Sequence, residues 1–172
     1  MIEILILYII HKREKTIYSI RKEIIEIFGT FTKPSIGTIH PALQRLLKEK
    51  AVSLTERMSD GGKKSSYYSI TRSGLEYFKK MFFNSGSDNP SLFYTQLQAR
   101  LGTMGLLNVE ERKRFLSEFS KKIEIYKFEL ENKLNDEFIE LDYYQTQLLN
   151  RTLNELNSLK DYINNLKVDH AG

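Results

Sequence analysis

Apolar residues in the first part of the chain recur at the spacing of helices. Residues 2–11 are apolar on almost every side, which predicts a short, buried helix. Residues 17–28 carry one apolar face, at positions three or four residues apart. Thr16 is a typical N-cap for this second helix, and Gly29 is a typical residue at its end.

A third helix follows Pro34 and Ser35. Ser35 is its expected N-cap, but a start nearer Thr38 fits equally well. With the earlier start Pro41 lies inside the helix and removes a backbone hydrogen bond, whereas with the later start it falls in the first turn, where it costs little. The expected buried stripe is Ile36, Ile39, Leu43, Leu46 and Leu47, and the opposite face holds Gly37, Thr38, Pro41, Gln44, Arg45 and Lys48.

A hairpin and a fourth helix come next. Residues 52–57 alternate as a strand, residues 60–62 (Asp-Gly-Gly) favour a type I′ turn, and residues 67–70 form the return strand. Thr71 caps the fourth helix, unless Ser73 begins it with a capping box. Three helices, a hairpin and a helix in this order are typical of a winged helix-turn-helix, a fold that binds DNA or protein.

The second half of the chain differs from the first in its Gly and Pro content. Residues 84–90 contain Gly and Pro and predict a connection, so we expect domains at 1–84 and 85–172. Residues 106–171 contain neither Gly nor Pro, which predicts long helices, the last of about 30 residues from Phe138 to Leu166. Such a helix carries more apolar surface than one subunit covers, so we expect it to pair both with another helix of its own chain and with a second subunit. The predicted fold is mainly α: a winged helix-turn-helix with a two-stranded wing, then a long-helix C-terminal dimerisation region.

Charge and composition narrow the function. Residues 1–84 hold 15 Lys and Arg against 8 Asp and Glu, while residues 85–172 hold 11 against 14. A basic first half favours a polyanionic partner. The chain has no Cys, three scattered His and no recognisable catalytic motif, so we expect no enzyme, no metal and no cofactor. The longest apolar run has seven residues against the roughly 20 that a membrane span needs, so we expect a cytoplasmic protein and no membrane partner.

The third helix carries a specific motif. Residues 33–43 read Lys-Pro-Ser-Ile-Gly-Thr-Ile-His-Pro-Ala-Leu, close to Pro-Ser-x-Gly-Thr-Ile-Tyr-Pro-Ala-Leu. This segment resembles the PadR family of bacterial transcriptional regulators. The resemblance spans about residues 2–83. Further matches, in order, are Tyr18, Leu46, the Glu-Lys-Ala-Val end of the helix at 49–52, Gly61-Gly62, Tyr67-Tyr68, Thr71, Gly74 and Leu75.

The resemblance implies a dimeric repressor that binds a palindromic operator. In the family, long C-terminal helices form the dimer, and a phenolic acid or toxic amphiphile lifts repression. His40 stands where the family usually has Tyr, and Ala51 where it usually has Gly. The chain has no Trp, so ligands that stack on a Trp platform are not supported.

Some residues have both a functional and a purely structural interpretation. Ser35 caps the helix or contacts phosphate, and Tyr18 and Tyr67 either donate to phosphate or belong to the core. The candidate DNA-binding residues are Tyr18, Lys33, Ser35, Gly37, Thr38, His40, Gln44, Lys48, Lys63, Lys64 and Tyr67. The candidate dimerisation residues are Leu141, Leu148, Leu149, Leu156, Leu159 and Ile163.

The expected function is a sequence-specific transcriptional regulator. Its partners are double-stranded DNA, a second copy of the chain and a possible small-molecule effector. Aromatic residues of the second half line an effector pocket or, more commonly for such residues, form core. The rival is a winged-helix and coiled-coil module that binds protein without DNA. Uncompensated positive charge on the third helix and the wing favours DNA, whereas an exposed apolar patch there favours protein.

Overall fold

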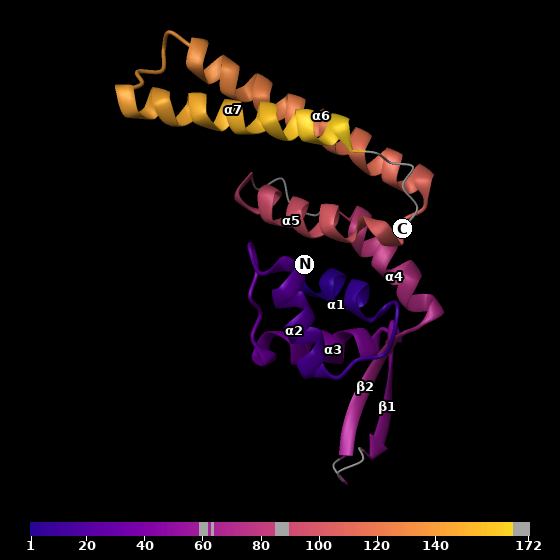
Figure 1. The fold of residues 1–172 in the computed structure, drawn as a ribbon. Helices are drawn as coiled ribbons and strands as arrows, with labels where there is room; N and C mark the ends of the chain where they lie inside the picture. The colour runs from indigo at the N-terminus through magenta and orange to yellow at the C-terminus, as the bar shows by residue number, and fades with distance from the viewer. Residues whose placement is uncertain (59–61, 63, 85–89, 167–172) are drawn as a thin grey trace. The chain divides into compact units, whose positions relative to one another are not determined.

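The structure is a computed structural model that describes residues 1–58, 62, 64–84 and 90–166 (Figure 1). It divides into two compact units, Met1–Leu106 and Leu107–Gly172. The predicted domain boundary at residues 84 and 85 falls inside the first unit. The first unit contains α1 (Ile2–Ile10), α2 (Ile17–Phe28), α3 (Ile36–Lys48), β1 (Val52–Met58), β2 (Lys64–Ile70), α4 (Arg72–Phe83), α5 (Pro90–Thr103) and the 3-10 helix η1 (Met104–Leu106). The second contains α6 (Val109–Asn135) and α7 (Tyr143–Asn165).

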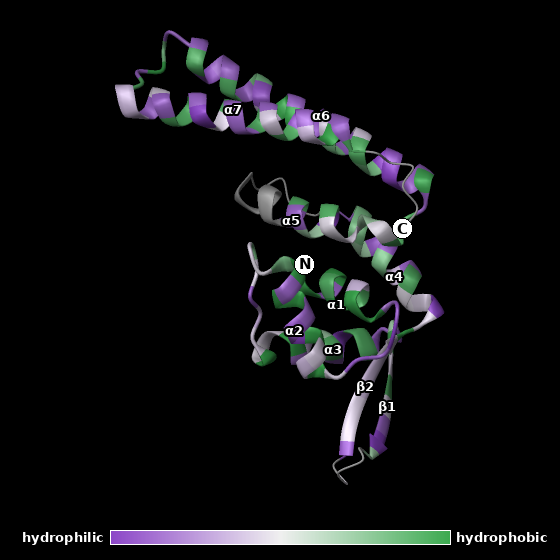
Figure 2. Cartoon of the chain, in the orientation of Figure 1, coloured by the Kyte–Doolittle hydropathy of each residue, from purple (hydrophilic) through white to green (hydrophobic). Residues whose placement is uncertain are grey.

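Helix α1 lies at the centre of the first unit. It packs against α2, α3, α4, α5 and β2, and most of its side chains are buried. Figure 2 shows hydrophobic residues along this helix. Gly102 of α5 lies against the ring of Phe28, where a Cβ atom would come within 2.6 Å of Phe28 Cε1. Helix α5 is therefore part of the winged-helix core.

Polar side chains set the helix starts as the sequence predicts. Thr16 accepts a hydrogen bond from the Ser19 amide at the start of α2. Thr71 accepts one from the Gly74 amide at the start of α4, and Thr71 rather than Ser73 is the N-cap. Satisfying these free amide groups is what makes Thr an effective cap.

The sequence left two starts open for α3, and the structure selects the earlier one. Ser35 is the N-cap and α3 begins at Ile36, so Pro41 lies inside the helix. Pro41 has no amide hydrogen to donate to the Gly37 carbonyl one turn earlier. Its ring is exposed, so the missing hydrogen bond lies on the solvent side of α3.

The wing is longer than predicted and is tied to the helical core. Strands β1 and β2 pair antiparallel, from Val52 opposite Ile70 to Met58 opposite Lys64. The predicted type I′ turn lies outside the described residues. Lys15 exchanges two backbone hydrogen bonds with Tyr68, of 3.0 and 2.8 Å, and its buried ammonium group lies 2.5 Å from a carboxylate oxygen of Glu23. The α1–α2 connection thereby extends the sheet beside β2.

The second unit is a pair of antiparallel helices. Asn108 and Glu111 form a capping box at the start of α6, which ends at Asn135. The prediction of a last helix of about 30 residues from Phe138 is wrong, because α7 starts at Tyr143 and has 23 residues. Asp142 and Gln145 form a capping box there and fix the start. Lys160 of α7 binds Glu124 of α6 at 2.5 Å.

No helix of the described residues is long and apolar enough to cross a membrane.

Candidate nucleic-acid interface

Helix α3 has one buried and one exposed face, as expected. Ile39, Leu43 and Leu46 are fully buried, while Ile36 and Leu47 at the edges of the stripe are half-buried. Ala42 completes the buried face. The exposed face consists of Gly37, Thr38, His40, Pro41, Gln44, Arg45 and Lys48.

The amino end of α3 is held by local hydrogen bonds. Ser35 Oγ accepts from the Thr38 amide at 3.2 Å, and the two hydroxyl oxygens are 3.1 Å apart. From α2, Arg21 Nε donates to the Pro34 carbonyl at 3.2 Å. Ser35 therefore caps the helix. A hydroxyl group can donate and accept at once, so Ser35 and Thr38 retain hydrogen-bonding capacity toward an outside partner.

Much of the positive charge expected on this surface is already paired. Arg45 Nε donates to Glu3 Oε1 at 2.6 Å, so the pairing with Glu49 that helical spacing allows is not formed. Lys64 lies within β2 and binds Glu56 at 2.6 Å. Local spacing did not reveal the Arg45 partner because Glu3 is 42 residues away.

Two lysines of the predicted set keep their charge available. Lys33 and Lys48 are exposed, and no ion pair to them is found within the described ranges 1–58, 62, 64–84 and 90–166. Lys63 lies outside the described residues. Lys33 precedes α3 and Lys48 ends it, so the two charges flank the exposed polar face of the helix.

The two candidate tyrosines occupy different environments. Tyr18 is 73% exposed on the first turn of α2, which excludes a role in the core. Tyr67 is half-buried on β2, with the guanidinium carbon of Arg57 5.6 Å from the centre of its ring. Arg57 in turn forms a two-pronged ion pair with Glu14. Tyr67 is thus part of a side-chain cluster with Arg57 and Glu14 that joins the wing to the α1–α2 connection.

The predicted dimerisation residues differ in their solvent exposure within the single chain. Leu156 and Ile163 are buried in the single chain. Leu149 and Leu159 are half-buried on α7, and Leu141 is half-buried in the α6–α7 connection. Leu148 is 60% exposed. Of the six side chains, Leu148 has the most apolar surface left for a second subunit.

The second unit exposes further apolar residues that the sequence did not assign to dimerisation. Ile125 and Phe128 lie one turn apart on α6 and are exposed. Phe138 and Ile139 are exposed in the α6–α7 connection. The sequence placed Phe138 at the start of the last helix and not on an exposed surface, and apolar spacing along α6 does not separate exposed residues from its buried stripe. Among the described residues no group of three or more His, Cys, Asp or Glu is placed to hold a metal ion.

Comparison with known proteins gives matches to PadR and PadR-like transcriptional regulators. The model of the transcriptional regulator PadR-like family matches residues 6–80. A PadR-like transcriptional regulator from Bacillus cereus is 33% identical, over 58% of this chain and 90% of that chain, with a TM-score of 0.42. Bacillus subtilis PadR in complex with operator DNA is 17% identical, over 95% and 94% of the two chains, with a TM-score of 0.47. The same protein with p-coumaric acid is 18% identical, over 95% and 91%, with a TM-score of 0.39. The curated proteins contain no match.

Proposed function

Because the chain belongs to the PadR-like family of transcriptional regulators, we propose that it binds double-stranded DNA through α3 and the wing. Membership rests on the family match at residues 6–80 and on 33% identity over 90% of a relative's length. The family consists of transcription regulators, and we propose that this chain likewise has a regulatory and not an enzymatic role. Its place of action is then the cytoplasm, where bacterial DNA lies.

The exposed face of α3 is the observation that carries the proposal. An α-helix fits the major groove, where each base pair presents a distinct set of donors and acceptors. His40 and Gln44 are one turn apart on this face, and both side chains can donate and accept hydrogen bonds. Lys33 and Lys48 supply charge for phosphates, while Gly37 leaves room for the DNA backbone. Ser35 and Thr38 add exposed hydroxyl groups at the start of α3, and Tyr18 adds one on the first turn of α2.

The rival function, a winged helix that binds only protein, requires an exposed apolar patch on α3 and the wing. None of the exposed large apolar side chains among the described residues lies on α3, while Leu54 and Met58 are exposed on β1 of the wing. The exposed face of α3 is polar apart from Pro41. DNA is therefore the partner that the surface favours.

We propose further that the protein is a repressor that binds a palindromic operator as a homodimer. The second unit leaves Leu148, Ile125 and Phe128 exposed, which is apolar surface that a second copy can cover. Release by a small aromatic or amphiphilic effector is part of the proposal. Bacillus subtilis PadR is a relative known with both operator DNA and p-coumaric acid.

The salt dependence of DNA binding tests the interface. Each phosphate that a lysine neutralises contributes about 0.9 to the slope of log affinity against log salt concentration. We expect Lys33→Ala combined with Lys48→Ala to flatten this slope by about 1.8, measured by fluorescence anisotropy on a random-sequence duplex. Lys113→Ala on α6 is the matched control and should leave the slope unchanged. Equal slopes for the double variant and the wild type would contradict an interface centred on α3.

A further inference from the structure

The outer half of the wing has little hydrophobic support. Of the residues in β1 and β2 only Val52 and Tyr68 are buried, and both lie in the half of the wing nearest the helices. Figure 1 shows the two strands extending away from the helices toward their turn. An isolated two-stranded hairpin is only marginally stable in water, so the direction of the outer half depends on its ties to the rest of the first unit.

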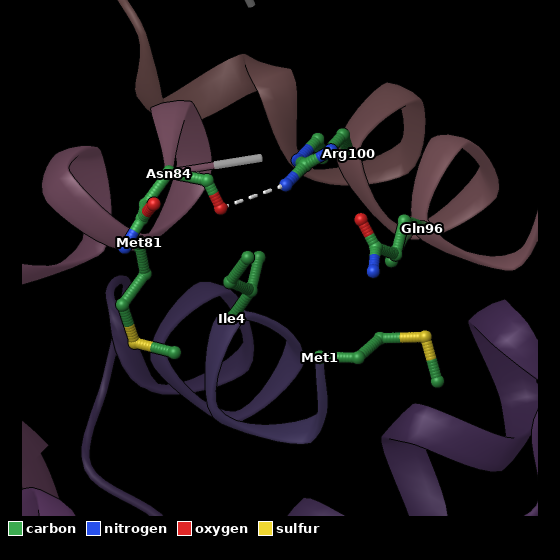
Figure 3. Close-up of a pocket in the computed structure, with 7 residues that line it drawn as sticks. Met1, Ile4, Met81, Asn84, Gln96 and Arg100 are labelled. Atoms are coloured by element: carbon green, nitrogen blue, oxygen red, sulfur yellow. Dashed lines mark hydrogen bonds between the residues drawn. The ribbon is translucent and has the colours of Figure 1, made fainter. Parts of the chain in front are cut away.

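The inner half of the wing is already held by the helices. Thr71 follows β2, and its Oγ1 donates to the Lys50 carbonyl at 2.7 Å, which joins the end of β2 to the segment just before β1. The far end of α4 is held as well, because Arg100 Nη2 of α5 donates to the Asn84 carbonyl at 3.3 Å (Figure 3). Only the outer half of the wing therefore needs a further support.

Arg57 supplies this support. It is the last residue but one of β1, and its guanidinium forms a two-pronged ion pair with the carboxylate of Glu14, in which Nη2 donates at 3.0 Å. The guanidinium also lies over the ring of Tyr67 on β2, 5.6 Å from its centre. A planar, two-pronged contact restricts direction as well as distance. One side chain thus links the outer half of the wing to the α1–α2 connection.

The α1–α2 connection is in turn joined to the helix that carries the DNA-binding face. Lys15 follows Glu14 in the chain, is buried, and lies 2.5 Å from a carboxylate oxygen of Glu23 on α2. Helix α2 holds the start of α3 through the hydrogen bond from Arg21 Nε to the Pro34 carbonyl at 3.2 Å. Polar contacts therefore run from the outer wing through α2 to α3.

We propose that the ion pair between Arg57 and Glu14 is a clamp that fixes the direction of the wing relative to α3. Arg57 and Glu14 are then positioning residues, which orient the wing and do not themselves contact phosphate. Elements that are aligned before binding lose less conformational freedom when the complex forms, so the clamp raises the affinity for DNA. This consequence for DNA rests on the proposed function, whereas the clamp itself does not.

The sign of one substitution separates the clamp from a simple effect of charge. Glu14→Ala removes a negative charge from the basic half of the chain, so charge alone, or the release of Arg57 onto a phosphate, would tighten DNA binding. The clamp predicts the opposite: affinity for a random-sequence duplex, measured by fluorescence anisotropy, should fall about threefold to fivefold. Equal or tighter binding by Glu14→Ala would overturn the proposal.

The matched control is Glu76→Ala, which removes the same charge at an exposed position on α4. It should bind DNA like the wild type or slightly more tightly. A loss of affinity in Glu76→Ala as large as in Glu14→Ala would overturn the specific role of Glu14.

Salt dependence distinguishes a misplaced wing from a smaller amount of folded protein. Glu14→Ala should flatten the slope of log affinity against log salt concentration by about 0.9 or more, because the wing loses at least one phosphate contact. A smaller folded fraction would lower the affinity equally at every salt concentration. An unchanged slope would therefore overturn the clamp.

Arg57→Lys tests the other partner of the ion pair. Lysine keeps the charge but has no planar fork, so this variant should lose affinity as Glu14→Ala does. The double variant should bind about as well as either single variant, because both changes break the same contact. Losses that add up in the double variant would contradict a shared role for the two residues.

Hydrogen exchange in the free protein tests the clamp without DNA. Residues 64–70 should exchange faster in Glu14→Ala than in the wild type, because the wing opens more often, while Glu76→Ala should match the wild type. Equal exchange in Glu14→Ala and the wild type would overturn the clamp. Faster exchange in a protein that binds no DNA would defeat the proposed function and support the clamp. DNA binding with unchanged exchange and affinity in Glu14→Ala would overturn the clamp and leave the proposed function intact.

Discussion

Gly74, the third residue of α4, has no room for a side chain. A Cβ atom there would lie 2.0 Å from the Ala51 carbonyl oxygen and 2.8 Å from Ile70 Cγ1. Its amide also donates to Thr71 Oγ1 at 2.9 Å. The glycine therefore allows α4 to start directly against the beginning of the wing.

Gly74→Ala should destabilise the protein because the nearest obstacle is backbone. We expect the free energy of unfolding to fall by about 1–3 kcal/mol, as for other overpacked core positions, measured by urea denaturation. Gly37→Ala is the control, since its Cβ would meet only Ser35 Oγ at 3.5 Å. Alanine there should stabilise α3, by up to about 1 kcal/mol. Equal stabilities for the two variants would contradict the packing described around Gly74.

Gln44 is the residue from which we expect the clearest sequence preference. It is exposed on α3, and a two-pronged contact of Gln with adenine is worth about 1–3 kcal/mol of discrimination. Gln44→Ala should relax the preference at one position in each half of the operator and leave affinity for random DNA nearly unchanged. Competition binding with single-base operator variants measures this. An unchanged preference at every position would exclude Gln44 from base contact.

At the scale of elements, capping residues close in sequence to a helix start were informative, whereas contacts between residues far apart in sequence could not be predicted. Thr16 identified the start of α2 because a capping residue acts within its own turn. For α3 the sequence left a choice between Ser35 and a start nearer Thr38, and the structure selects Ser35. The start of α7 was placed too early because Phe138 and Leu141 continue the apolar spacing, although Asp142 and Gln145 already encode a capping box. The pairing of Arg45 with Glu3 depends on the tertiary fold, so no local pattern reveals it.

The capping box of α7 has a measurable effect on stability. Asp142→Ala removes the acceptor for the Gln145 amide and should cost about 1 kcal/mol of helix stability, with a matching loss of helical circular dichroism in urea. Asp161→Ala, an exposed position inside α7, serves as the control. It should be neutral or stabilising because alanine favours helix interiors. If the control cost as much as Asp142→Ala, the start of α7 would not depend on this cap.

The wing is expected to contribute charge to DNA binding. Replacing both Lys63 and Lys64 with Ala should weaken binding to operator and random DNA alike, and flatten the salt slope by about 2 if both lysines contact phosphates. Glu56→Gln is the complementary control, because it releases Lys64 from its ion pair and should tighten binding. A salt slope that neither change moves would mean that the wing does not touch DNA.

At the scale of the whole molecule, positive charge is concentrated in the first half of the sequence and the long helices in the second half. The first 84 residues carry an excess of seven positive charges, and the remaining residues an excess of three negative charges. This charge count favours a polyanionic partner for the first half of the chain. It overstated the charge available on the interface, because Arg45 and Lys64 find acidic partners in the fold.

We expect a dimer in solution, held by the second unit. Light scattering should give about twice the 20.2 kDa of one chain, and the mass should persist on dilution into the micromolar range. Leu148→Asn should shift the equilibrium toward monomer without unfolding the protein, because this side chain is exposed in the single chain. A folded 20.2 kDa species at micromolar concentration would contradict the dimer.

Selection of DNA fragments from a random-sequence pool tests the central claim most directly. The protein is incubated with the pool at moderate salt, and the bound fragments are recovered, amplified and sequenced over several rounds. A dimer that presents two copies of α3 to successive major grooves should enrich an inverted repeat, with half-sites about one helical turn of DNA apart. Enrichment of no sequence, or of a single site without an inverted partner, would contradict recognition of a palindromic operator by a dimer of this chain.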